Sequence, residues 1–196
     1  CALPIYNQGS LDVSGISFDT AAAAATVTTN STTAAATTTA SVAQLTNGAV
    51  HFQDNGGTDT LAFSTTGATM GYLNVDGYET IAVTAAQSTA AHTMNFRDSS
   101  GYSTITYVEG ASGYMDHSVT LSSVASGTTV KIGGLYGDGA DTFTIAAAVG
   151  TNDTLTLTSV STALTTDALA TVATSGFETV NFVAGGVDAA HTLAAT

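Results

Sequence analysis

The sequence predicts an all-β solenoid, a parallel β-helix or β-roll in which short strands stack coil upon coil. Strand-like segments recur about every 12 residues, and longer blocks of the chain repeat. The residue set is also unusual, because only 9% of residues are charged while small Thr, Ala and Ser side chains abound. Stacked coils favour such side chains, since equivalent residues pack against one another in ladders.

The expected strands alternate apolar and polar residues, which is the period-two pattern of a strand with one buried face. Gly, Asn, Asp and Ser separate them. Helices are disfavoured, because Glu, Lys, Arg and Gln are scarce and Thr is common. The predicted strands are residues 49–52, 60–63, 80–83, 93–96, 104–108, 119–121, 130–132, 142–145, 154–157 and 179–182.

A longer repeat lies over this rhythm. The stretch GYETI at 77–81 returns 99 residues later as GFETV at 176–180. At the same distance, AAHTM at 90–94 returns as AAHTL at 189–193. We expect the two copies to fold alike, with equivalent glutamates and with the aromatic and the Ile or Val side chains inward or at an interface.

Two architectures remain open at this point. A pair of β-sandwiches of roughly 100 residues each fits the long repeat, whereas the short rhythm favours the solenoid. We divide the chain into a Thr/Ala-rich low-complexity segment, 1–47, irregular or weakly stranded, a first β repeat unit, 48–147, and a second, incomplete unit, 148–196. The incomplete copy suggests a piece of a longer protein, and Cys1 is then a fragment boundary or, alternatively, a lipidated mature N-terminus.

The charge balance excludes several partners. The chain holds 15 acidic residues against Arg97 and Lys131, a net charge of −13. Neutralising nucleic-acid phosphates or anionic lipid headgroups requires many basic side chains, so neither partner is expected. No apolar run is long enough for a transmembrane segment. With a single cysteine, no disulfide forms within the chain.

Three acid-rich turns precede predicted strands. Short carboxylates and amides on tight turns are oxygen ligands that suit calcium, although Asp and Asn also favour ordinary turns. Both interpretations stay open for these turns. The candidate metal ligands are Asp54, Asn55, Asp59, Asp138, Asp141, Asn152 and Asp153.

These turns resemble degenerate members of the RTX family, the calcium-binding nonapeptide repeats of type I secreted proteins. The matching positions are Gly137, Gly139, Asp141 and Phe143, then Gly57, Asp59 and Leu61, then Asp153 and Leu155. Strict nine-residue tandem repeats are absent, so the resemblance implies isolated calcium sites. The repeated GYETI and GFETV strands, the Thr/Ala/Ser richness and the scarcity of Lys and Cys resemble bacterial S-layer proteins exported by that route.

The resemblance implies a secreted, calcium-stabilised structural protein at the cell surface that assembles with itself into a lattice or filament. A cell-surface polysaccharide is a further candidate partner. The alternative is the repeat stalk of a secreted adhesin or RTX-type exoprotein. We expect no enzyme, because the chain contains neither a G-x-S-x-G nor an HExxH motif. His92 and His191 occupy the same place in both repeat copies, which favours a packing role over metal binding.

Overall fold

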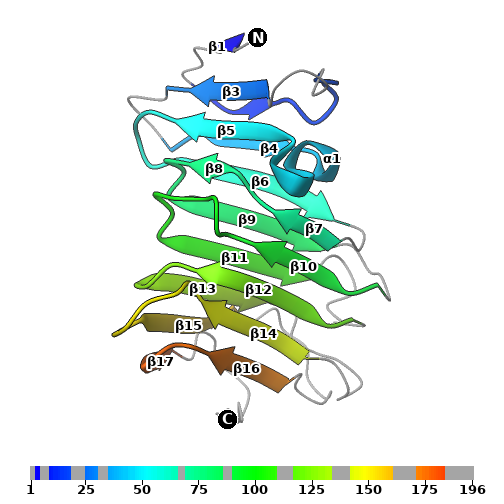
Figure 1. Ribbon diagram of the computed structural model, residues 1–196. Helices are drawn as coiled ribbons and strands as arrows, with labels where there is room; N and C mark the ends of the chain where they lie inside the picture. Colours follow the sequence, from blue (N-terminus) through cyan, green and yellow to red (C-terminus); the bar gives the residue numbers. More distant parts are fainter. Residues whose placement is uncertain are drawn as a thin grey trace.

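The computed structural model is a parallel β-solenoid that winds from the N-terminus at one end to the C-terminus at the other (Figure 1). It describes residues 3–4, 9–18, 25–30, 35–65, 69–85, 90–109, 117–133, 142–160 and 171–183. Every pairing between strands of these residues is parallel. The predicted solenoid is confirmed, and the alternative of two sandwiches is wrong, because sandwich sheets pair their strands antiparallel.

Two faces build each coil. One face is a single eight-stranded sheet, in which each strand pairs with the strand one coil further on. Its strands in order are β2 (Leu11–Asp12), β4 (Thr37–Ala40), β6 (Thr60–Thr65), β9 (Thr80–Ala85), β11 (Thr104–Glu109), β13 (Thr128–Gly133), β15 (Thr154–Val160) and β17 (Thr179–Val183).

The other face consists of two shorter sheets that follow one another along the solenoid (Figure 1). The first sheet holds β1 (Leu3–Pro4), β3 (Ala25–Thr29), β5 (Val50–Asp54) and β8 (Val75–Asp76). The second holds β7 (Thr69–Tyr72), β10 (His92–Asn95), β12 (Val119–Val124), β14 (Thr142–Ala147) and β16 (Thr171–Ser175). Each coil contributes one strand to each face, which accounts for the predicted recurrence of a strand about every 12 residues.

The core is a set of side-chain ladders between the two faces. Successive strands place their inward residues in register, and the central ladder is Leu61, Ile81, Ile105, Val130 and Leu157, each at most 2% exposed. Because side chains alternate across a strand, the preceding residues form an outward ladder. That ladder is Thr37, Thr60, Thr80, Thr104, Thr129 and Thr156. β-Branched threonine suits this half-exposed pleated surface.

The Thr/Ala-rich N-terminal segment belongs to the same winding. Its strands β3 and β4 pair with β5 and β6 of the next coil. A single helical turn, α1 (Val42–Leu45), and a 3-10 turn, Thr46–Gly48, connect β4 to β5. The domain boundaries at 47/48 and 147/148 stay a prediction.

Glycines at one corner permit the coils to stack closely. Gly77 has a φ of 81° and Gly101 a φ of 82°, a left-handed conformation that side chains disfavour. A Cβ on Gly77 would lie 2.2 Å from the carbonyl oxygen of Asp54, and one on Gly101 would lie 2.9 Å from the amide nitrogen of Gly77. Only glycine therefore fits at this corner, coil upon coil.

The glutamates and aromatic residues predicted to be equivalent in the two copies occupy similar places, whereas the AAHTL copy at 189–193 lies outside the described residues. Glu79 Oε2 accepts a hydrogen bond from the Asp59 amide (2.7 Å), and Glu178 Oε2 accepts one from the Asp153 amide (2.6 Å). Tyr78 is buried, and its counterpart Phe177 packs against the core.

The two copies differ in register. The ladder that starts at Thr80 reaches Asn181, two residues beyond the sequence counterpart Thr179. A shift of two residues leaves every side chain on its original face, so the core tolerates it.

The central ladder is open to a direct test. We expect Ile105→Ala to lower the free energy of unfolding by about 2–5 kcal/mol, because it removes buried methyl groups and leaves a cavity between fixed neighbours. Thr106→Ala on the outward face of the same strand is the matched control, with an expected change of about 0.5 kcal/mol or less. Chemical denaturation of the three proteins measures both values, and equal losses would contradict the ladder.

Candidate functional site

The structure brings two of the predicted metal ligands, Asp54 and Asp59, to one coil corner and buries them there. Asp54 is 6% exposed and Asp59 is 2% exposed. Asp54 Oδ1 accepts a hydrogen bond from Thr29 Oγ1 (2.6 Å), and its Oδ2 accepts one from the Gly56 amide (3.0 Å). Asp59 Oδ1 accepts one from the Ala36 amide (2.7 Å), whereas its Oδ2 is buried without a hydrogen-bond partner.

This corner is electrostatically unfavourable for a carboxylate. Burial raises the pKa of Asp59, the hydrogen bond from the Ala36 amide lowers it in part, and the Asp54 and Glu79 carboxylates raise it further. The two basic side chains of the chain lie elsewhere. Arg97 pairs with Asp98 (3.2 Å), and Lys131 is exposed. The Asp59 carboxyl thus has a backbone donor on one oxygen and no counter-charge for the other.

A second corner repeats the arrangement. Asp153 is 8% exposed, and its Oδ2 is also buried without a hydrogen-bond partner. Gly150 lies against this carboxylate, since a Cβ there would come within 2.7 Å of Asp153 Oδ2.

The structure does not bury the other predicted ligands that it describes. Asn55 and Asn152 are exposed, and Asn152 adopts a left-handed turn with a φ of 72°. Asp138 and Asp141 lie outside the described residues.

Each corner offers oxygen atoms that could bind a metal ion, but only a few of them. Calcium takes six to eight oxygen ligands, as a rule. In the described part of the chain, no group of three or more His, Cys, Asp or Glu side chains is arranged to hold a metal ion. An ion at Asp59 or Asp153 would therefore take most of its ligands from backbone carbonyls or water. Calcium binding stays a prediction.

A buried cluster of two histidines and a tyrosine lies further along the solenoid. The Tyr107 hydroxyl is 2.5 Å from His92 Nδ1 and 2.9 Å from His117 Nε2, and the two imidazole centroids are 3.9 Å apart. All three side chains are at most 2% exposed. Burial lowers the pKa of His92 to about 4, and His117 lowers it as well.

The core role predicted for His92 is confirmed, and its repeat counterpart His191 lies outside the described residues. His117 is a partner that sequence spacing misses. The two histidines are 25 positions apart in the sequence, and coil stacking brings them together.

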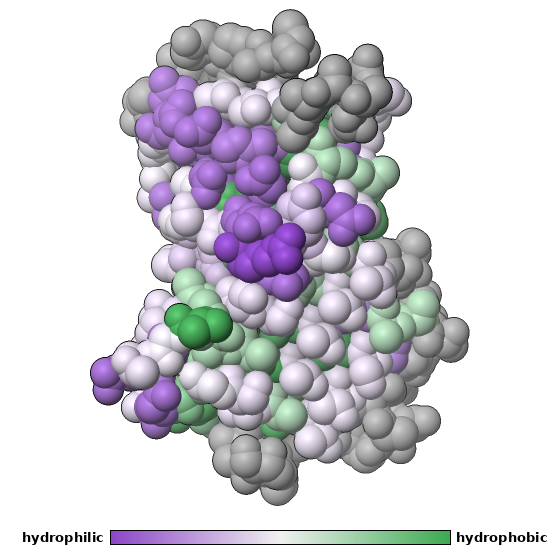
Figure 2. All heavy atoms as spheres, viewed as in Figure 1, coloured by the Kyte–Doolittle hydropathy of each residue, from purple (hydrophilic) through white to green (hydrophobic). Residues whose placement is uncertain are grey.

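The outward face of the first short sheet carries a polar group that resembles a hydrolytic triad in composition only. His51 Nε2 lies 2.8 Å from Asp76 Oδ2, and Ser100 Oγ donates to Asp76 Oδ1 (2.6 Å). A serine nucleophile needs the histidine beside it as base, whereas here the aspartate lies between the two. The group bridges successive coils on the face where hydrophilic residues gather (Figure 2).

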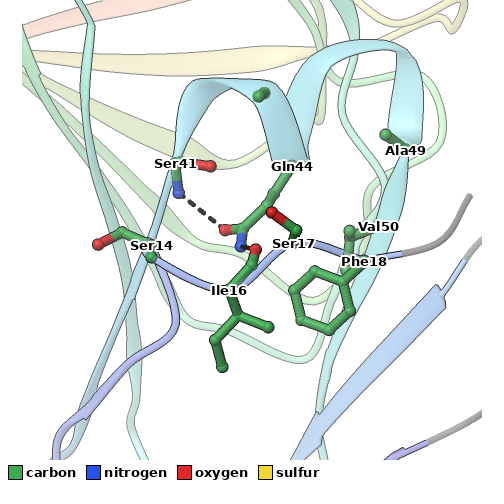
Figure 3. A pocket seen from close by; sticks show the side chains of 10 residues that line it. Ser14, Ile16, Ser17, Phe18, Ser41, Gln44, Ala49 and Val50 are labelled. Carbon is green, nitrogen blue, oxygen red and sulfur yellow. Dashed lines mark hydrogen bonds between the residues drawn. The ribbon is translucent and has the colours of Figure 1, made fainter.

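A hollow lies beside α1 (Figure 3). Gln44 closes its wall, donating from Nε2 to the carbonyls of Val13 (2.7 Å) and Ile16 (2.8 Å) and accepting from the Ser41 amide (2.9 Å). The described residues that line it include serines, Ala49, Val50 and Phe18, and none of them is acidic, basic or a histidine. This hollow therefore presents no acid–base group for chemistry.

No protein-family model, curated protein or solved structure matches the chain. Within the described residues, no helix is long and apolar enough to cross a membrane. The resemblance to RTX and S-layer proteins stays a prediction.

The Asp59 corner predicts a specific pH response. Since the native pKa of Asp59 is raised above 3.8, its stabilising contribution is present below that pH and is lost as pH rises through the native value. Asparagine keeps an oxygen for the Ala36 amide and carries no charge. In metal-free buffer, Asp59→Asn should melt at a higher temperature than the native protein at neutral pH, and the difference should vanish in acid.

Asp98→Asn changes an exposed carboxylate and serves as the control, with the native pH profile expected. Thermal melts across the acidic range measure all three proteins. A lower melting temperature for Asp59→Asn at neutral pH without metal would contradict the assignment of an uncompensated buried charge.

Proposed function

We propose that the chain is a self-assembling structural segment of a bacterial surface layer or sheath, located outside the cell. The observation that carries the proposal is the outward threonine ladder of the eight-stranded sheet, which repeats in register from coil to coil.

The surface composition supports a structural role. The outward threonine ladder gives the eight-stranded face hydroxyl groups with few charges, a surface suited to lateral packing between neighbours. The net charge of −13 opposes that packing through mutual repulsion. A divalent cation would reduce this repulsion, because the chain's two basic residues cannot offset it.

Calcium belongs to the proposal as a stabiliser of single coils. Its support is the pair of buried, unpartnered oxygens on Asp59 and Asp153, each in a corner that also holds a glutamate. Because these oxygens are buried, an ion there would strengthen the corner from inside and would not bridge two copies. Saturation at 100 times the dissociation constant would add about 2.7 kcal/mol to stability.

Tyrosines give little support to a polysaccharide partner. Tyr78, Tyr102 and Tyr107 are buried in the core and unavailable for stacking on sugars. The Arg97 guanidinium lies over the Tyr72 ring, with its central carbon 4.5 Å from the ring centroid.

The assembly proposal is tested at Thr104. We expect Thr104→Lys to abolish concentration-dependent association, because it places a charge in the middle of the outward threonine ladder. Val149→Lys is the matched control, since Val149 is fully exposed and lies between β14 and β15, outside that ladder, and it should associate like the native protein. Sedimentation and electron microscopy read out the assemblies. A native protein that stays monomeric at high concentration would contradict assembly and favour the adhesin stalk.

The calcium proposal has its own readout. Excess chelator should lower the melting temperature of the native protein, and Asp59→Asn combined with Asp153→Asn should remove that response. Asp98→Asn should keep it. Identical melting curves with calcium and with chelator would contradict calcium binding and leave the assembly test unaffected.

A further inference from the structure

The cluster of His92, Tyr107 and His117 joins neighbouring coils and both faces of the solenoid. His92 lies in β10 and is paired in register with Val119 of β12, two residues after His117. Tyr107 comes from β11, on the opposite face. Phe143 of β14 packs edge-on against the Tyr107 ring, with centroids 5.3 Å apart. Two strands and the turn before β12 thus meet at one buried hydroxyl, and a third strand packs against the ring that carries it.

Proton counting fixes how this cluster is bonded. The Tyr107 hydroxyl has one proton and lies between two imidazole nitrogens, so it donates to one and accepts from the other. If it donated to His92 Nδ1, the His92 proton would sit on Nε2, which is buried and has no hydrogen-bond partner. A buried N–H without an acceptor is costly. The favoured order is therefore His92 Nδ1–H to Tyr107, and Tyr107 O–H to His117 Nε2.

In this order, His92 can accept a further proton at Nε2 alone. The resulting N–H would face no acceptor, and the positive charge would lie in the core, 3.9 Å from the centroid of the His117 ring. Among the described residues packed against β10, the titratable groups that face His92 are Tyr107 and His117. No carboxylate contributes to the shift of the His92 pKa. Among the described residues, no group therefore accommodates a positive charge at His92 Nε2.

We propose that His92, Tyr107 and His117 form an acid-sensitive latch that holds the β10 and β12 coils together when neutral and releases them when His92 takes up a proton. Release begins at the corner where the three side chains meet, because the imidazolium must reach water. The neighbouring coils keep their own ladders, so the opening is local. This inference does not depend on the proposed function.

The direction and size of the effect follow from proton linkage. The pKa of His92 is about 4 in the folded protein and 6.5 in the unfolded chain. Full stability is therefore present above pH 6.5 and falls as the pH drops toward about 4. That difference corresponds to about two orders of magnitude in the folding equilibrium constant.

The test follows the imidazole nitrogens by NMR while the pH is lowered, with hydrogen exchange of the strand amides as the second readout. We expect His92 to show the Nδ1–H form and to stay neutral down to about pH 5, close to its folded value of about 4. Amides of β10 and β12 should then exchange sooner than those of β5 and β6. An ordinary histidine titration for His92, or equal exchange in all four strands, would overturn the latch.

A substitution separates the latch from general acid instability. His92→Gln keeps a side-chain donor for Tyr107 but does not titrate, so its stability should fall far less between pH 6.5 and 4 than that of the native protein. His51→Gln removes a histidine outside the cluster, and its β10 and β12 strands should lose protection in acid as they do in the native protein. If His92→Gln loses as much stability in acid as the native protein does, the proposal is overturned. If that variant fails to fold, the NMR titration of the native protein decides the question alone.

Discussion

The in-register stacking of inward side chains is the constraint on which the rest of the structure depends. Each coil is too thin to bury its own apolar residues, so Leu61, Ile81, Ile105 and Val130 are buried by one another. Parallel pairing fixes which residues meet, and the period of two fixes which side faces the core. Once the ladder is set, the corners, the glycines and the polar clusters take their positions from it.

A second constraint follows from the scarcity of basic residues. Buried acids in most proteins rely on Lys or Arg, but this chain has two such residues. Its buried or corner carboxylates accept hydrogen bonds from backbone amides instead, as Asp59 does from Ala36 and Glu79 does from Asp59. These bonds run from one coil to the next, so the acids act as staples between coils. The Oδ2 atoms of Asp59 and Asp153 are buried where no described amide donates a hydrogen bond to them.

The sequence predicts the repetitive parts of the fold well and the contacts between coils poorly. Alternation, turn residues and the GYETI and GFETV echo are local, and they suffice for the strands, the solenoid and the equivalence of Glu79 and Glu178. Burial of Asp54 and Asp59 is not local, because it depends on how the corners of adjacent coils close. The sequence indicated turns with calcium ligands but not their burial, and the structure buries three of those carboxylates, Asp54, Asp59 and Asp153.

The histidine cluster shows the same limit. No spacing rule connects His92 with His117, since one coil of chain separates them and its length varies along the solenoid. The N-terminal segment is a related case. Its Ala and Thr runs give a weak local signal, yet β3 and β4 form because the next coil supplies their hydrogen-bonding partners.

Parallel stacking also determines how the molecule bears load. All hydrogen bonds between successive strands point along the stacking direction, from one coil to the next. Tension along that direction strains every bond of a coil boundary at once, so the weakest boundary sets the breaking force. A pull that lifts one end of a strand instead loads its hydrogen bonds one after another, so they open in turn. A sheet of such columns would resist stretching along its columns far better than peeling at its rim, and its tears would begin between coils.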